Sequence, residues 1–203
     1  MLFNIPFGAA PDDARPSDTL SQTLVVVGML GWRPNFSGID RFLERSFPII
    51  RSRVPGARLR IVGSHLREDA RARWSRVAGV EVIGAVESVA GEYQQAALSV
   101  VPVFTGGGTK IKVLESYRHN RACVVSAHAH RGYEEALPAG DVASVASNDE
   151  SFAEQCVALL RDPARRNRMA AAGRAVVASR FTFAAFSTAV AEAVRAVRLA
   201  RRG

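Results

Sequence analysis

The chain has 203 residues, of which 48% are hydrophobic and 23% charged, with a formal net charge of +8. This composition is typical of a globular protein and excludes a disordered chain, a collagen-like fibre and a small disulfide-stapled domain. The longest apolar runs are too short to cross a bilayer, and the N-terminus lacks the basic region of a secretory signal. We therefore expect a cytoplasmic protein, with peripheral association at the inner membrane surface as an open alternative.

Strand and helix patterns alternate after the first twenty residues, which have the proline-rich composition of a linker. The apolar run 23–27 predicts a strand buried on both faces. Apolar residues recur at steps of three and four over 36–54, which predicts one helix, capped by Asn35 or Ser37 and kinked at Pro48.

The same alternation continues to the C-terminus. Further strands are predicted over 58–62, 80–83, 98–103, 122–126 and 142–146. Further helices are predicted over 66–77, 86–97, 110–119, 150–160, 163–179 and 183–201. Asn120 falls at the end of one of these helices, where a left-handed residue is needed and asparagine is tolerated.

This alternation predicts an α/β fold, namely a Rossmann-like doubly wound parallel sheet of about six strands with helices on both faces and extra C-terminal helices. We expect a linker-like segment over 1–20, a Rossmann-like domain over 21–181 and a basic amphipathic helix over 182–203. Ligands of such sheets bind beyond the carboxyl ends of the strands. The candidate loops therefore follow Val27, Val62, Ile83, Phe104 and Ser126.

The most informative stretch is VVPVFTGGGTKIKVLES, residues 100–116, where a strand leads through three glycines into a helix. Glycines allow positive φ and close approach to the backbone, and free amides at a helix start favour an anion. Lys110 and Lys112, the only lysines of the chain, add positive charge. Lys112 and Glu115 share a helix face, so a phosphate at Lys112 with a ribose at Glu115 is a coherent nucleotide site.

A structural interpretation of the same stretch stays open. It is a flexible glycine loop beside a solvated Lys–Glu pair, on a helix whose Ile111 and Leu114 face the sheet. The stretch lacks the GK[ST] ending of a P-loop, and no GxGxxG follows the first strand. Neither an ATPase nor a dinucleotide oxidoreductase is therefore favoured.

Three further groups of residues have weaker signals. For His128 and His130 a metal or acid–base role is one interpretation, and a solvent-facing pair is the favoured one. For Trp32, stacking on a ligand and simple packing are equally supported. Cys123 and Cys156 lie in apolar patterns without any CxxC, which predicts buried thiols rather than a zinc site.

The segments VVVGMLGWRPN, RLRIVG, VEVIGAV, LSVVPVFTGGGTKIKVLES, ACVVS and SFAEQCVALLRDPARRNRM carry a family resemblance. Over residues from about 20 to 185, the chain resembles the C-terminal, donor-binding half of group 1 glycosyltransferases of the GT-B type. The resemblance implies that residues 21–181 bind a nucleoside diphosphate sugar such as a UDP- or GDP-sugar, with no cofactor and no metal required. It matches Lys112 to the lysine near the donor diphosphate, Glu115 to the glutamate that holds the ribose, and Gly106–Thr109 to the loop beside the phosphates and sugar.

The sequence departs from the family pattern in three ways. Gly107 stands where many relatives have a first glutamate, so a side-chain contact to the donor sugar is lost or replaced by backbone amides. Met29, Pro34 and Asn35 replace an arginine and a Lys–Gly pair, which leaves Arg33 as the only nearby cation. The family's N-terminal half, with its acceptor site and usual base candidates, is missing, so we assign no catalytic residue.

The first functional hypothesis is the donor half of a hexosyltransferase, with the acceptor held by a missing N-terminal domain or partner chain. The alternative is a non-catalytic nucleotide-binding or assembly module derived from that fold. Attraction to an anionic membrane surface by the arginines stays open, but no nucleic acid is expected because aromatic residues are not interleaved with them. The candidate donor-binding residues are Gly106, Gly107, Gly108, Thr109, Lys110, Lys112, Glu115 and Arg33.

The helix predicted over 182–203 allows two interpretations. It has an apolar stripe of Phe183, Phe186, Val190, Val194 and Val197, with Arg195, Arg198, Arg201 and Arg202 near its end. The stripe either meets a partner or a membrane surface, or it packs on the chain's own sheet. The family resemblance suggests that this tail crosses back toward the N-terminal half.

Overall fold

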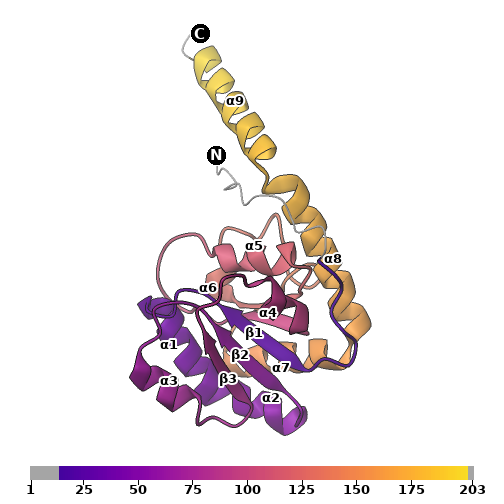
Figure 1. Ribbon diagram of the computed structural model, residues 1–203. Coiled ribbons are helices and arrows are strands. Elements are labelled where there is room, and N and C mark those ends of the chain that lie inside the picture. Colours follow the sequence, from indigo (N-terminus) through magenta and orange to yellow (C-terminus); the bar gives the residue numbers. More distant parts are fainter. Residues whose placement is uncertain (1–13, 201–203) are drawn as a thin grey trace.

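The computed structural model describes residues 14–200, with the backbone alone for the last two. Within them, six parallel strands form one sheet in the order β3-β2-β1-β4-β5-β6 (Figure 1). The strands are β1 Thr23–Val27, β2 Arg58–Val62, β3 Val80–Gly84, β4 Leu98–Val101, β5 Cys123–Ser126 and β6 Ser144–Ala146. This is the strand order of the Rossmann fold, and it confirms the predicted fold class.

The chain reverses its direction of travel across the sheet at β1. β1 pairs with β2 along its whole length, from Thr23 opposite Arg58 to Val27 opposite Val62. On its other side β1 pairs with β4, starting at Leu24 opposite Leu98. The carboxyl ends of β1 and β4 are therefore the switch point at which such sheets bind ligands.

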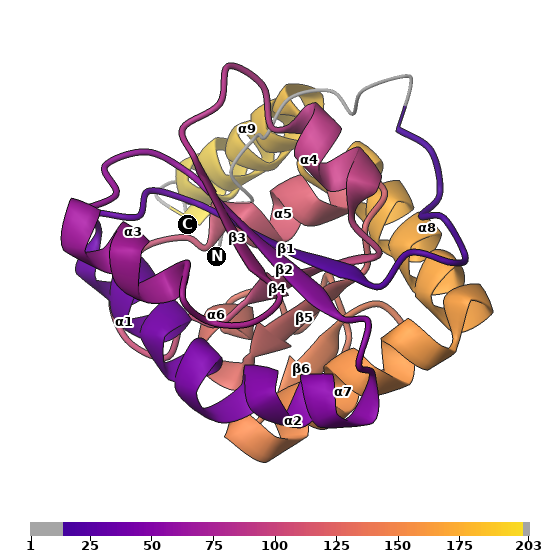
Figure 2. The ribbon, with the colours of Figure 1, turned by 60° about the horizontal axis from the view of Figure 1, so that its bottom comes forward.

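Helices cover both faces of the sheet (Figure 2). Their bounds are α1 Arg33–Arg41, η1 Phe42–Ser46, α2 Phe47–Arg53, α3 Glu68–Trp74, α4 Ala90–Gln95, α5 Ile111–Arg118, α6 Ala127–His130, α7 Asp149–Arg161, α8 Pro163–Arg180 and α9 Phe183–Ala200. Leu24 and Val26 of β1 belong to the larger core, with α1, α2, α3 and α7, whereas Val25 and Val27 pack against α4 on the opposite face. Because both faces of β1 are buried, its sequence is continuously apolar.

The helix predicted over 36–54 is interrupted. A π-helical turn, η1, separates α1 from α2, and Pro48 lies in the first turn of α2. Proline has no N–H to donate to the preceding turn, so a change of hydrogen-bond register here is a physical consequence of its position. The predicted cap was wrong, because the helix begins at Arg33, and Asn35 is buried with its side chain in other bonds.

Several other predicted elements differ from the structure in their bounds. The helix predicted over 86–97 is shortened to α4, Ala90–Gln95, and α6 had not been predicted. The strand predicted over 98–103 ends at Val101, immediately before Pro102. Asn120 has φ +55°, which confirms the predicted left-handed position.

An N-terminal segment, residues 14–20, lies along α8 and is held by buried arginines. The Arg121 guanidinium is 1% exposed and donates to five main-chain carbonyls, one of them that of Arg15. Arg166 donates to the Ser17 hydroxyl and to the Asp18 carbonyl. Residues 1–13 of the predicted linker lie outside the described part of the chain.

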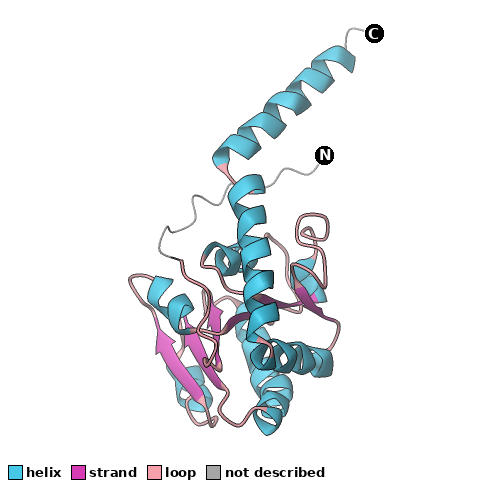
Figure 3. Ribbon diagram, turned by 90° about the vertical axis from the view of Figure 1, so that its right-hand side faces the viewer, coloured by secondary structure: helices cyan, strands magenta, loops and turns pink. Residues whose placement is uncertain are grey.

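Helix α9 projects away from the sheet, whereas α8 packs against α5 and α7 (Figures 1 and 3). The main contact of α9 is with α8. Phe183 is 72% exposed and Val197 is 55% exposed. Arg201 and Arg202 lie outside the described residues. Among residues 14–200, no helix combines the length and hydropathy needed to cross a membrane.

Candidate functional site

A pocket of about 360 Å³ opens at the switch point between β1 and β4. It lies between the turn after β1 and the glycine loop that leads into α5. Its lining residues are Val27, Gly28, Met29, Trp32, Asn35, Gly107, Gly108, Thr109, Ile111, Lys112 and Glu115. The structure thus brings the glycine loop, Lys112 and Glu115 to one site, together with residues from the turn after β1.

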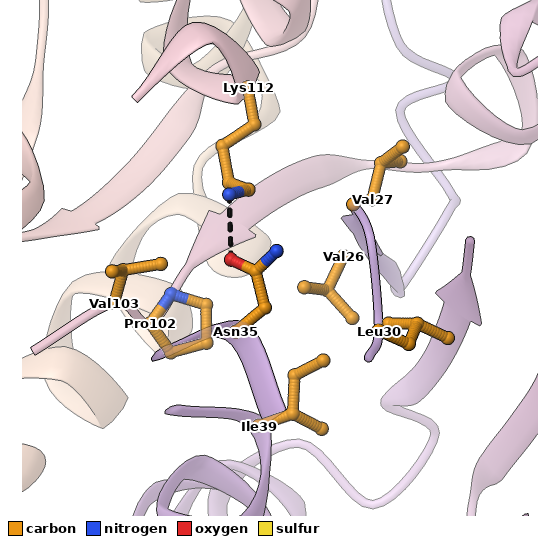
Figure 4. A pocket seen from close by; sticks show the side chains of 9 residues that line it. Val26, Val27, Leu30, Asn35, Ile39, Pro102, Val103 and Lys112 are labelled. Atoms are coloured by element: carbon orange, nitrogen blue, oxygen red, sulfur yellow. Dashed lines mark hydrogen bonds between the residues drawn. The ribbon is translucent and has the colours of Figure 1, made fainter. Parts of the chain in front are cut away.

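Lys112 reaches from α5 toward α1 (Figure 4). Its Nζ donates to Oδ1 of Asn35 at 2.7 Å, and the Asn35 amide donates to the Met29 carbonyl at 2.9 Å. The same Nζ lies 5.7 Å from the centroid of the Trp32 ring. An ammonium has three protons, and Asn35 is its only hydrogen-bond partner among residues 14–200. Lys112 is therefore fixed in direction and keeps donors for a ligand.

Burial, together with the positive charge of Lys110, lowers the pKa of Lys112 to about 8. The Lys112 side chain borders a small cavity of about 10 Å³ (Figure 4). The other walls of this cavity include the apolar side chains of Val26, Leu30 and Ile39, which keep water from the amine. Burial disfavours the charged form of an amine, and the nearby carboxylate of Glu115 offsets this effect only in part. An anion in the pocket would supply further counter-charge.

Gly28 makes room for this arrangement. A Cβ at residue 28 would lie 3.0 Å from the Asn35 amide nitrogen and 3.2 Å from Cε of Lys112. Any larger residue would therefore displace the Lys112–Asn35 pair. The absence of a side chain at Gly28, directly after β1, is therefore a requirement of this arrangement.

Glu115 lies one turn after Lys112 and is half-buried. Its Oε2 accepts a hydrogen bond from the hydroxyl of Tyr93 at 3.3 Å, and the Tyr93 ring stacks on His119 at a centroid distance of 4.7 Å. Burial raises the pKa of Glu115, and the bond from Tyr93 works in the opposite direction. The carboxyl group is thus aimed by a buried tyrosine and keeps acceptor capacity toward the pocket.

A second hollow, of about 300 Å³, continues on the other side of Glu115. It shares Val27, Gly28 and Glu115 with the first pocket, and it extends over the ends of β2 and β3. The rest of its wall is mainly apolar or backbone, from Val62, Gly63, Ser64, Ala85, Val86 and Val89. Together the two hollows form one groove with a carboxylate at its middle.

Lys110 and Arg33, unlike Lys112, do not line the pocket. Lys110 is 7% exposed and directs its ammonium to the carbonyls of the glycine loop beneath which it lies. Arg33 is exposed at the start of α1 and does not line the pocket. Ile111, expected on the sheet side, is 44% exposed and lines the pocket, whereas Leu114 is buried. The donor-binding assignments of Lys110 and Arg33 stay predictions.

The other sequence candidates have separate surroundings. Trp32 lines the pocket beside Lys112. His128 contacts the carbonyl of Gly106, and His130 is buried against the carbonyl of Leu137. Both cysteines are buried, as predicted. Within residues 14–200, no group of three or more His, Cys, Asp or Glu side chains is arranged to hold a metal ion.

Sequence reasoning missed Asn35 and Tyr93 as parts of the site. Asn35 had been one of two candidate helix caps, with Ser37, although the preceding Pro34 is a good first-turn residue and places the helix start earlier. Tyr93 is 22 positions before Glu115 and belongs to another helix, α4. No local pattern signals that contact.

Comparison with known proteins gives one family match. The model of the family described as glycosyl transferases group 1 matches residues 21–162, which is more than half of the chain. No curated protein sequence matches the chain.

Solved structures resemble the chain in fold at low sequence identity. TarM of S. aureus superposes with a TM-score of 0.74 at 10% identity, over 95% of this chain and 37% of TarM. Sucrose-phosphate synthase of Thermosynechococcus elongatus gives 0.69 at 18%, over 98% and 52%. Anabaena HepE in complex with UDP-glucose gives 0.66 at 14%, over 87% and 49%. The chain therefore spans about half, or less, of the length of these proteins.

Proposed function

Since the chain belongs to the group 1 glycosyltransferases, we propose that it binds the nucleoside diphosphate sugar from which such an enzyme transfers a hexose. The acceptor is held by another part of the enzyme, an N-terminal half or a partner chain. The single observation that carries the proposal is the groove at the switch point, where Lys112 and Glu115 lie one turn apart beside a glycine loop.

The groove accounts for each part of such a donor. The diphosphate lies at Lys112 and the amides of residues 107–109, the ribose hydroxyls bond to Glu115, and the base occupies the apolar hollow beyond it. UDP is the favoured nucleotide, because HepE, which shares this fold, has been solved with UDP-glucose. The sugar lies on the glycine-loop side, near Trp32.

The proposed chemistry is stabilisation of the leaving group. In the transfer, the bond between the anomeric carbon and the β-phosphate oxygen breaks, and negative charge develops on the diphosphate. Lys112 and the loop amides face that charge in a partly dehydrated pocket, where fixed donors are most effective. We assign no base to this chain, and the proposal includes no cofactor besides the donor substrate.

Calorimetric titration of the purified chain with UDP-glucose, GDP-glucose, ADP-glucose and NAD tests the proposal. We expect one of the nucleotide sugars to bind and NAD to fail, because the dinucleotide fingerprint is absent from the turn after β1. Failure of all three sugar nucleotides at millimolar concentration contradicts the proposed function. Transfer at about 1 per second or faster by this chain alone would show that it contains the acceptor site itself.

The affinity for UDP-glucose should depend on the protonation of Lys112. Well below its pKa of about 8 the amine is charged in the free protein, so the affinity should change little below pH 7 and should be about twofold lower at pH 8, where half of the amine is neutral. Above pH 8 the bound diphosphate must recruit a proton, and the affinity should fall by up to about tenfold per pH unit. Calorimetry in buffers of different ionisation enthalpy measures the proton uptake. Lys112→Met should abolish the uptake, and equal uptake in that variant would contradict this assignment.

We further propose that α9 meets another part of the enzyme or an anionic membrane surface. Phe183, Val194 and Val197 are exposed, the other apolar side chains of its stripe are partly buried, and most of the helix lies outside the packed body (Figure 3). An exposed apolar stripe of this length favours association.

Removal of residues 183–203 should leave the rest of the chain folded, because the main contact of α9 is with α8. The intact chain should self-associate in sedimentation experiments or bind phosphatidylglycerol vesicles, and the truncated chain should do neither. Unfolding of the truncated chain would show that the stripe is part of the core. An intact chain that is strictly monomeric and ignores the vesicles would equally contradict the proposal.

A further inference from the structure

Lys110 lies beneath the glycine loop, and the loop accepts all the hydrogen bonds that its ammonium can donate. Its Nζ donates to the carbonyl oxygens of Gly106 at 3.3 Å, Gly107 at 3.1 Å and Gly108 at 2.8 Å. An ammonium has three protons, so this set of acceptors accounts for its whole donor capacity. Unlike Lys112, it keeps no donor for a molecule in the pocket.

The convergence of three carbonyls fixes the direction of three N–H groups. In a planar trans peptide the C=O of one residue and the N–H of the next point in opposite directions, and residues 14–200 contain no cis peptide. The N–H groups of Gly107, Gly108 and Thr109 therefore point away from Lys110. They donate to no protein acceptor in the described part of the chain, and all three residues line the pocket.

The loop can adopt this shape because of its glycines. Gly106 has φ +90° and Gly108 has φ +77°, values that other residues rarely adopt. A Cβ on Gly106 would also lie 2.7 Å from Cγ of Pro34, so the loop rests directly on the start of α1. Curling the chain in this way lets successive carbonyls meet one cation.

His128 holds the same loop from the other side. Its Nε2 lies 2.8 Å from the carbonyl oxygen of Gly106, and its Nδ1 lies 2.6 Å from Nη2 of Arg131. Arginine can only donate, so Nδ1 accepts, and the proton of a neutral His128 is on Nε2, where it donates to Gly106. Gly106 uses both lone pairs, one for Lys110 and one for His128.

The short helix that carries His128 is itself tied to the start of the loop. The Ser126 hydroxyl accepts from the Ala129 amide at 3.1 Å and donates to the Val103 carbonyl. Lys110 also has its pKa lowered by burial and by the charge of Arg131, which is consistent with an ammonium stabilised by carbonyl dipoles rather than by a carboxylate.

We propose that Lys110 and His128, with Arg131 setting the tautomer of His128, are positioning residues that turn the amides of residues 107–109 toward the donor. This inference rests on the proposed function for the identity of the ligand. It replaces the direct contact between Lys110 and the donor, predicted from the sequence, with a role through the backbone. A cation under the loop orients the peptide dipoles, and the dipoles meet the diphosphate or the sugar.

Four variants test this role: Lys110→Met, Lys110→Gln, His128→Phe and Arg131→Met, with Arg76→Met as a control. Arg76 is exposed just after α3 and does not line the pocket. Its variant therefore removes one positive charge at a position outside the pocket. We expect Lys110→Met to weaken UDP-glucose binding at least about tenfold, and His128→Phe and Arg131→Met by about three- to tenfold. Lys110→Gln should recover part of the loss, because its amide still donates to the carbonyls.

A second measurement needs no ligand. In ¹⁵N relaxation spectra of the free chain, the amides of Gly107, Gly108 and Thr109 should gain flexibility in Lys110→Met and His128→Phe but not in Arg76→Met. Unchanged loop amides, or unchanged UDP-glucose affinity, in Lys110→Met would overturn the proposal. So would a Lys110→Gln variant that binds no better than Lys110→Met. If the wild-type chain binds no nucleotide sugar, the proposed function fails, and the relaxation data alone decide whether the loop is held as described.

Discussion

Replacing Lys112 with methionine is expected to weaken UDP-glucose binding by about 1.5–3 kcal/mol, the range for hydrogen bonds to a charged group. This corresponds to roughly 10- to 150-fold in the dissociation constant. Lys112 is the pocket cation whose direction is fixed by Asn35 and whose remaining protons have no protein acceptor among residues 14–200. Methionine keeps the length of the side chain and removes its donors. Isothermal titration calorimetry of the two chains at pH 7 measures the difference.

The same variant should be at least as stable as the wild type. At pH 7 the wild-type amine is charged in the folded and unfolded chains, and burial makes that charge costly in the folded one, as its lowered pKa shows. Urea denaturation should therefore give an unfolding free energy that is not reduced. Arg76→Met is the matched control for removal of one charge and should bind normally. Unchanged affinity in Lys112→Met would remove Lys112 from the donor site.

Gly173→Ala is expected to destabilise the fold by about 1–3 kcal/mol, the usual cost of overpacking a filled core. A Cβ at residue 173 of α8 would lie 2.1 Å from Cδ1 of Tyr117. The Tyr117 ring cannot easily move aside, because it is buried on α5 and its hydroxyl donates to the Val142 carbonyl at 2.7 Å. The expected loss corresponds to roughly 2–4 °C of melting temperature per kcal/mol for a chain of this size.

Gly91→Ala provides a control that should raise the stability of the chain where Gly173→Ala lowers it. Gly91 lies in α4 and is exposed, and a Cβ at this residue would meet no atom within 4 Å outside its own helical turn. Alanine there should stabilise the chain by up to about 1 kcal/mol, because it restricts the unfolded chain without a clash. Thermal unfolding of the two variants beside the wild type compares them directly. A Gly173→Ala variant as stable as the wild type would show that α5 and α8 are not packed as closely as described.

The sheet was predictable because its signals are local. Short apolar runs ended by glycine or proline marked β1 and β4 to within two residues of the observed bounds. The interrupted first helix was not predictable in the same way. The periodic stripe from Phe36 to Val54 is equally compatible with a continuous helix, and the change of register at η1 depends on Pro48 and on packing against α7. The hydrophobic pattern of residues 36–54 gives no information on their packing against α7.

That Lys112 and Glu115 share one pocket was predictable from the sequence, but most of the surrounding geometry was not. The spacing of Lys112 and Glu115 placed both on one side of a helix, and both line the pocket. The sequence shows that Lys110 is charged but not that its ammonium is directed under the loop. Tyr93 reaches the site only through the tertiary fold, so residue type and spacing provide no functional signal for it. Asn35 stands at a position that the family resemblance singles out, but its bond to Lys112 likewise depends on the tertiary fold.

The five carbonyls around Arg121 belong to Arg15, Tyr93, Gln94, His119 and Asn120, and all are main-chain atoms. Every amino acid presents a main-chain carbonyl, so these acceptors survive any substitution that preserves the backbone path. Only the guanidinium is irreplaceable, since lysine lacks its planar, branched set of donors. Arg15 contributes only its main-chain carbonyl to these bonds. Another residue could therefore replace it while the N-terminal segment stays attached. Substitution is therefore tolerated at the acceptor residues but not at Arg121. This one residue attaches three separate stretches of the chain to each other.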